Sequence, residues 1–193
     1  MKKSTIILIV IAAVVLIGFL WYRNIFNAEL KLNQQVQGQW ANVESSYQRR
    51  ADLIPNLVNT VKGYAEHEKT TLNEVIEARS KATSVNINPE NLDANSLQAF
   101  QQAQNGLSSA LSRLLVVVER YPDLKANQNF LELQAQLEGT ENRINVERNR
   151  YNETVRTYNS YIGRFLIKPL FSFKEKPYFE AQEGTEVAPK VEF

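Results

Sequence analysis

The 193-residue sequence contains no cysteine, one histidine, seven glycines and six prolines. Without cysteine, the chain has no disulfide, thiolate metal site, iron–sulfur cluster or cysteine nucleophile. A single histidine excludes metal sites that need a histidine pair and leaves one candidate base for a catalytic triad. The scarcity of glycine and proline suits long helices. We therefore expect no catalytic residue, no metal and no cofactor.

An excess of charge of one sign is also missing. The chain carries 22 Lys and Arg against 21 Asp and Glu, a net charge of +1. Proteins that bind nucleic acid normally show a basic excess clustered on one face, so no nucleic-acid partner is expected. The length suits one domain with an appendage rather than two full domains.

A long apolar segment stands near the start of the sequence. Residues 4–22 carry no charge, and at ~1.5 Å per residue they span roughly 28 Å as a helix, about one hydrocarbon core. Trp21 and Tyr22 lie where an aromatic belt is expected, and Arg23 follows as an interfacial anchor. We predict a transmembrane anchor over residues 1–23, in contact with the lipid bilayer through residues 4–22.

A cleaved signal peptide is the alternative, because Lys2 and Lys3 form a positive N-terminal region. No small-x-small cleavage site follows the apolar run, which favours an uncleaved anchor. Arg23 and Lys31 follow the span, so positive charges on the N-terminal side prevail by about one, counting the terminal amine. This count favours a cytoplasmic N-terminus and an external body.

Apolar residues recur at helical spacing through most of the remaining chain. One pattern runs from Val36 to Ile76, a second from about Ser96 to Arg120, and a third from about Leu124 to Phe165. The composition of residues 84–95 indicates a loop. Asp93 or Ser96 is the expected N-cap of the helix that follows. Residues 181–193 are polar and acidic, and we expect a disordered tail there.

Pro55 interrupts the first pattern, which predicts either one kinked helix or two helices with Asp52 capping the second. The predicted fold class is all-α: a single N-terminal transmembrane helix followed, over residues 24–180, by an elongated antiparallel bundle of three to four long helices. An intermolecular coiled coil would satisfy the same periodicity. The short connections favour folding within one chain.

Three features follow one another along the sequence. The first is the N-terminal anchor. The second is the passage 37–82, with Trp40, the Arg49–Arg50 pair and the run 52–58. The third is the passage 119–162, which begins Glu-Arg-Tyr-Pro-Asp-Leu-Lys. Together they resemble the LemA family of bacterial membrane proteins.

This resemblance implies a single-pass protein of the bacterial cytoplasmic (inner) membrane, with a helical bundle and no assigned catalytic activity. It also implies an envelope context, because family members are placed near proteases of the HtpX type and include relatives in magnetosome membranes. The chain departs from the family at Phe165–Leu166, where Phe-Pro is common. The exit from the last helix is therefore expected to be displaced.

Polar residues on the apolar faces are the candidates for structural or interaction roles. Arg50 and Glu147 fall on the apolar faces of the first and third patterns, which predicts an ion pair that fixes helix register. Alternatively, Arg49 and Arg50 together form a binding site for a carboxylate or a phosphate head group. Asn152 and Asn159 share a face and are expected to hydrogen-bond across the bundle. The full candidate set is Trp40, Arg49, Arg50, Asp52, Pro55, Glu138, Glu141, Glu147, Arg148, Tyr151 and Asn152.

Other residues suggest chemistry but fit it poorly. His67 lies between Glu66 and Glu68, yet adjacent helical positions point about 100° apart and cannot converge on a metal. Glu138 and Glu141 form a possible carboxylate pair, although this spacing usually marks a solvated helix face. Five tyrosines suggest either an aromatic groove or core packing: Tyr47, Tyr64, Tyr151, Tyr158 and Tyr161.

The sequence therefore predicts a non-enzymatic, membrane-tethered scaffold or adaptor that binds another envelope protein or itself. The alternative is a membrane-shaping protein that acts through self-assembly. That role requires a lipid-facing strip, for which residues 165–179, rich in Phe and Lys, are the candidate. A hydrolase has no catalytic motif to support it.

Overall fold

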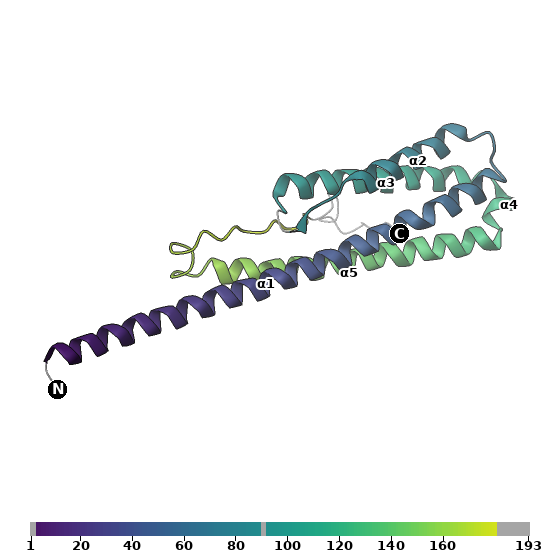
Figure 1. Cartoon of the computed structure of the whole chain (residues 1–193). Helices are drawn as coiled ribbons and strands as arrows, with labels where there is room; N and C mark the ends of the chain where they lie inside the picture. The colour runs from purple at the N-terminus through teal and green to yellow at the C-terminus, as the bar shows by residue number, and fades with distance from the viewer. Residues whose placement is uncertain (1–2, 90–91, 181–193) are drawn as a thin grey trace, which may run out of the picture.

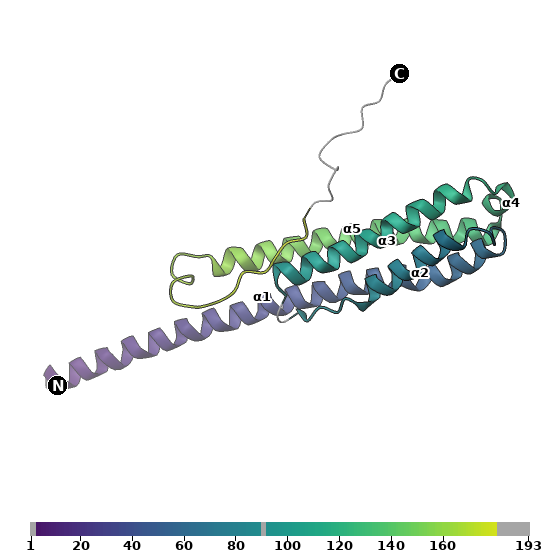
Figure 2. The same ribbon diagram turned by 90° about the horizontal axis from the view of Figure 1, so that it is seen from above.

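The computed structural model describes residues 3–89 and 92–180. These residues form five helices and no strand: α1 (Lys3–Lys62), α2 (Lys69–Ser84), α3 (Ala94–Val118), α4 (Pro122–Lys125) and α5 (Gln128–Ile162). Four of the helices are long, and they run alternately out and back along one axis (Figures 1 and 2). The predicted all-α class and elongated antiparallel bundle are confirmed. The predicted tail, residues 181–193, lies outside the described residues.

The first helix joins the apolar segment to the bundle without a break. α1 has 60 residues, which at ~1.5 Å per residue makes a rod of roughly 90 Å. Its N-terminal part projects beyond the other helices (Figure 1), with apolar side chains exposed along Ile6 to Leu20. Among the described residues, α1 is the helix long and apolar enough to cross a membrane. The boundary predicted at residue 23 falls inside this continuous helix.

Amphipathic faces of the four long helices bury two apolar clusters in series. The cluster nearer the apolar segment is built around Trp40, Val43 and Tyr151. The distal cluster is built around Ile54, Leu107 and other apolar residues. α1 packs along α5, α2 packs along α3, and α1 also packs on α2, whereas α3 and α5 approach each other little. The bundle is thus least closed along its α3–α5 side.

Side-chain caps mark where α3 and α5 begin. Asp93 accepts a hydrogen bond from the Ser96 backbone N–H at 2.7 Å, and the Asp93 N–H donates to Ser96 Oγ, so the predicted cap is present. The third predicted helix is not continuous, however. Pro122 begins the single turn α4, and Asn127 caps a new start at α5 by accepting from the Phe130 N–H. Apolar periodicity passes through this break because α4 buries Leu124 in the same core.

Pro55 neither breaks α1 nor begins a second helix. The first predicted pattern, Val36 to Ile76, is instead divided at residues 63–68, between α1 and α2. Proline has no N–H, so the carbonyl of Ala51, four residues earlier, lacks its usual helical donor. Arg79 of α2 supplies one, because its Nε donates to Ala51 O at 2.7 Å. The proline thereby leaves the Ala51 carbonyl free to accept a hydrogen bond from Arg79, and this bond links α2 to α1. Asp52, expected as a possible cap, is exposed on its helix and accepts from Gln48 Nε2 at 2.8 Å.

Replacing Arg79 with alanine is expected to lower the free energy of unfolding by about 1–2 kcal/mol, because the buried Ala51 carbonyl loses its donor. In a Pro55→Ala background the same change should cost much less, since the alanine introduced there brings its own N–H. Thermal unfolding of the detergent-solubilised full chain, followed by circular dichroism, measures both. Arg113→Ala, which removes an exposed ion pair to Glu74, is the matched control. Equal costs of Arg79→Ala in both backgrounds would contradict the role given to Pro55.

Candidate binding site around a buried arginine

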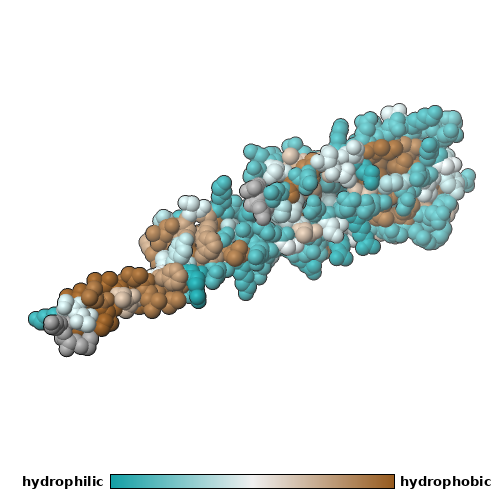
Figure 3. Space-filling view, in the orientation of Figure 1, coloured by the Kyte–Doolittle hydropathy of each residue, from teal (hydrophilic) through white to brown (hydrophobic). Residues whose placement is uncertain are grey.

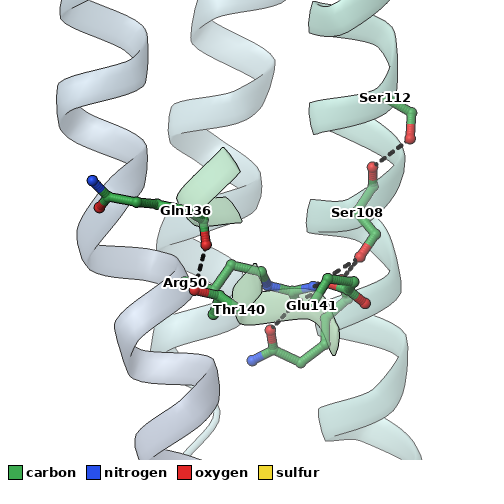
Figure 4. A network of polar contacts seen from close by, with 7 residues as sticks. Arg50, Ser108, Ser112, Gln136, Thr140 and Glu141 are labelled. Atoms are coloured by element: carbon green, nitrogen blue, oxygen red, sulfur yellow. Dashed lines mark hydrogen bonds and ion pairs between the residues drawn. The ribbon is translucent and has the colours of Figure 1, made fainter. Parts of the chain in front are cut away.

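The buried side chain of Arg50 connects helices in the middle of the bundle. Arg50 on α1 is 2% exposed. Its Nη1 donates to Glu141 Oε2 on α5 at 2.8 Å and to Ser108 Oγ on α3 at 3.0 Å. Its Nη2 donates to Gln104 Oε1 at 2.7 Å, and the guanidinium lies 5.1 Å from the Tyr47 ring centroid. Figure 4 shows this side chain crossing from α1 to its acceptors.

The polar network extends from Arg50 through Gln104 to α2, the long helix that Arg50 does not contact by a hydrogen bond. Gln104 is buried, and its Nε2 donates to the Ala82 carbonyl of α2 at 3.2 Å. Ser112 donates to the Ser108 carbonyl one turn away, at 3.0 Å (Figure 4). Every long helix therefore contributes an atom to the hydrogen-bonded surroundings of one positive charge.

The predicted pair between Arg50 and Glu147 is wrong. Glu147 is buried, but its carboxylate accepts from Gln39 Nε2 at 2.7 Å and from Arg150 Nη1 at 3.0 Å. Gln39 of α1 therefore lies opposite Glu147 of α5. Because the two helices are antiparallel, Arg50, which follows Gln39 by eleven residues, lies opposite a part of α5 that precedes Glu147 in the sequence. Glu141 occupies that position. The register-fixing ion pair exists, but its acidic partner is Glu141.

Glu141→Gln is expected to lower the free energy of unfolding by about 1–3 kcal/mol, because it leaves a buried guanidinium without its counter-charge. Arg50→Gln should cost about 3–5 kcal/mol. The double variant should cost less than the sum of the two, whereas Arg50→Gln and Glu147→Gln should be additive. Urea unfolding of the full chain in detergent measures the variants against the unmodified protein. Coupling of Arg50 to Glu147 instead would refute the assignment.

An open cleft lies between α3 and α5, directly over Arg50. Its volume is about 320 Å³. Leucines form the walls, namely Leu57, Leu111, Leu115 and Leu137, while Ser108, Ser112, Gln134, Glu138 and Glu141 provide polar atoms around Arg50. Sequence reasoning singled out Glu138 and Glu141 as a carboxylate pair but missed the leucines. Their helical spacing marked them only as core residues.

The cleft combines apolar walls with a small set of polar groups. Its polar groups are hydroxyls, one amide, two carboxylates and an arginine whose charge Glu141 already offsets. No cluster of His, Cys, Asp or Glu suitable for a metal occurs within residues 3–89 and 92–180. His67 lies in the turn between α1 and α2, where Glu68 accepts from Arg120 and from the Tyr121 hydroxyl. The cleft therefore presents apolar side chains flanked by polar and acidic groups.

The remaining predicted residues gather around a second feature, the extended segment 174–180, which we call the C-terminal strap. Asn152 Nδ2 donates to Phe179 O at 3.0 Å, and Asn152 Oδ1 accepts from the Phe179 N–H at 2.9 Å. Asn159 makes the same pair of bonds to Lys176, both at 2.9 Å. The two asparagines do not bond across the bundle as predicted. Their amides instead hold the strap along α5.

Phe179 fixes the strap in the core. Its ring stacks on Trp40 at 5.9 Å and meets Tyr151 edge-on at 5.2 Å. The Arg148 guanidinium lies 5.0 Å from the Phe179 ring centroid and donates to Glu180 O at 2.7 Å. Trp40, Arg148, Tyr151 and Asn152 are thus structural contacts of the strap. Arg49 is exposed and joins neither site, so the two adjacent arginines do not act as a pair.

The tyrosines belong mainly to the core rather than to an open groove. Burial raises the pKa of Tyr151, whose hydroxyl donates to Pro177 O at 3.2 Å. Burial and then the nearby Glu29 carboxylate raise the pKa of Tyr158, whose hydroxyl donates to Glu29 Oε1 at 3.1 Å. Burial also raises the pKa of Tyr47. The folded chain therefore holds these phenols neutral where an unfolded chain would ionise them.

Stability is consequently expected to fall as the pH rises above about 10, the ordinary tyrosine pKa. Below that pH the phenols are neutral in both the folded and the unfolded chain, so their contribution to the free energy of unfolding is fully present. Tyr151→Phe removes one such group and should flatten the dependence of the unfolding temperature on pH between about 9.5 and 11.5. Tyr178→Phe, at an exposed position, is the control. An unchanged slope in Tyr151→Phe would contradict the proposed cause.

The chain is similar to one protein family and to several known proteins. A model of the LemA family matches residues 39–193. The chain is 26% identical over 197 positions to magnetosome protein MamQ 1 of Paramagnetospirillum magneticum, covering 92% of this chain and 72% of that protein. It is 23% identical over 139 positions to protein LemA of Metamycoplasma hominis, covering 72% and 60%, respectively.

Proposed function

Because the chain belongs to the LemA family and α1 is long and apolar enough to span a membrane, we propose that it is a non-enzymatic, membrane-anchored scaffold or adaptor of the bacterial envelope. The observation that carries this proposal is the leucine-walled cleft between α3 and α5. It is a built recognition surface, held open by the bundle and joined to the anchor by one continuous helix.

The cleft fits one occupant best, an amphipathic helix of another protein. An added helix would bury Leu111, Leu115 and Leu137, which the weak α3–α5 contact leaves accessible. Glu138 lines the rim on the α5 side, so Lys or Arg beside the apolar face of the partner would complement it. A helix with these features would complete the open side of the bundle.

The anchor determines where this recognition takes place. Positive charge before the apolar segment favours a cytoplasmic N-terminus. The bundle then extends from the outer face of the cytoplasmic membrane. Since the bundle continues the axis of α1, the cleft lies in the distal half of the rod, within reach of another protein of the envelope.

A photo-crosslinking amino acid at Ser112, on the cleft wall, should form an adduct with one defined protein in the native membrane. The adduct should disappear when Leu115→Glu is added, because the charge blocks apolar contact. It should persist with Val116→Glu, since Val116 is adjacent and 71% exposed but does not line the cleft. Mass spectrometry of the adducts identifies the partner, and circular dichroism of each purified variant verifies its fold.

Two results would overturn the proposal. Loss of the adduct in Leu115→Glu and Val116→Glu alike would show that the contact is not specific to the cleft. An adduct with a second copy of this chain, lost only in Leu115→Glu, would show that the cleft serves self-assembly. The second result would favour the membrane-shaping alternative.

A further inference from the structure

An exposed apolar loop follows α5 and returns beside α1. Phe165 is 89% exposed, Leu166 is 56% and Leu170 is 63% exposed. The loop is nevertheless ordered by its own backbone, because the Lys168 N–H donates to Arg164 O at 3.0 Å and the Phe171 N–H donates to Ile167 O at 2.9 Å. Large apolar side chains held outward by a fixed backbone indicate a contact surface.

The loop meets α1 at the end of its apolar segment. The Phe171 ring lies 5.5 Å from that of Tyr22 and 6.3 Å from that of Trp21, measured between centroids. Phe173 stacks on Phe171 at 5.3 Å. Figure 3 shows an apolar patch beside α1 that continues the apolar surface of its N-terminal part, ahead of the hydrophilic bundle. If residues 4–22 cross the bilayer, this loop therefore lies at the membrane surface.

Basic side chains surround the apolar ones. Arg164 and Lys168 lie on the loop, Lys174 follows it, and Arg23 is the next residue after Tyr22 on α1. The acidic residue Glu175 pairs with Lys168 at 3.4 Å. Apolar side chains flanked by Lys and Arg are typical of segments that insert into the interface of a bilayer with anionic lipids.

We propose that residues 164–171 form a second membrane contact, in which Phe165, Leu166 and Leu170 insert into the interfacial region of an anionic leaflet. Continuity with the spanning segment selects the bilayer as the occupant rather than another protein. Two contacts on adjacent elements, α1 and this loop, restrict the tilt of the bundle relative to the membrane. The contact is shorter than the strip 165–179 predicted from sequence, because Lys176 and Phe179 are buried in the strap.

The absence of cysteine makes a direct test simple. Single cysteines carrying a nitroxide label are introduced at Phe165 and, separately, at Leu166 in the full chain. The protein is reconstituted in vesicles of phosphatidylglycerol and phosphatidylcholine. Collision of the label with oxygen, which concentrates in lipid, is compared with collision with a water-soluble nickel chelate. Val116→Cys is the matched control, because Val116 is apolar and 71% exposed at the distal end of α3.

Labels at Phe165 and Leu166 should lose most of their collisions with the nickel chelate while keeping those with oxygen. The label at Val116 should collide readily with both. Replacing phosphatidylglycerol with phosphatidylcholine should reduce the protection. Nickel accessibility at Phe165 and Leu166 equal to that at Val116 would overturn the proposal. Protection from both reagents that grows with the protein-to-lipid ratio would also overturn it, in favour of contact between copies.

A label at Ile11, in the middle of the apolar segment, separates this inference from the anchor on which it rests. Accessibility of Ile11 to oxygen but not to nickel establishes the span. With the span established, an exposed label at Phe165 refutes only the loop contact. A nickel-accessible Ile11 refutes the anchor, and with it both the loop contact and the membrane-anchored scaffold.

Discussion

The charge of Arg50 is the constraint on which the arrangement of the four long helices depends. Burying a guanidinium is costly unless its hydrogen bonds are made and its charge is offset. The two terminal nitrogens of Arg50 donate to Gln104 and Ser108 of α3 and to Glu141 of α5, whereas its Nε has no partner among the described residues. Gln104 in turn reaches Ala82 of α2. Sliding any one helix by a turn would leave part of this network without partners. Apolar packing alone would tolerate such a slide more easily.

The same register sets the features at both ends of the bundle. It brings Glu29 to Tyr158 and Ile25 to Tyr161 where α5 ends. The loop after α5 consequently meets α1 at Trp21 and Tyr22, and the strap returns along Asn159 and Asn152. At the distal end, the small contact between α3 and α5 leaves the leucine cleft open. The leucine cleft and the loop after α5 are therefore held in fixed relation along one rod.

Much of the architecture followed from the sequence because apolar periodicity states which face of a helix is buried. The antiparallel bundle was predictable in this way, whereas the long apolar segment was predictable from its uncharged run and the Asp93 cap from its residue type. The break at Ala126–Asn127 was not, since Leu124 and Phe130 on its two sides are both buried apolar residues of the same core. Pro55 left two outcomes open from sequence, and the donor from Arg79 that accompanies the uninterrupted helix comes from a distant part of the chain.

What the sequence determined by itself is local: the apolar segment, the helical faces, and the presence of an arginine and glutamates among core positions. Only the tertiary structure decided that Arg50 pairs with Glu141 and that Glu147 pairs elsewhere. Periodicity fixes the rotation of a helix about its axis but not its displacement along a neighbour. It also cannot show that Asn152 and Asn159 bind the strap, because their partners are backbone groups that every residue carries.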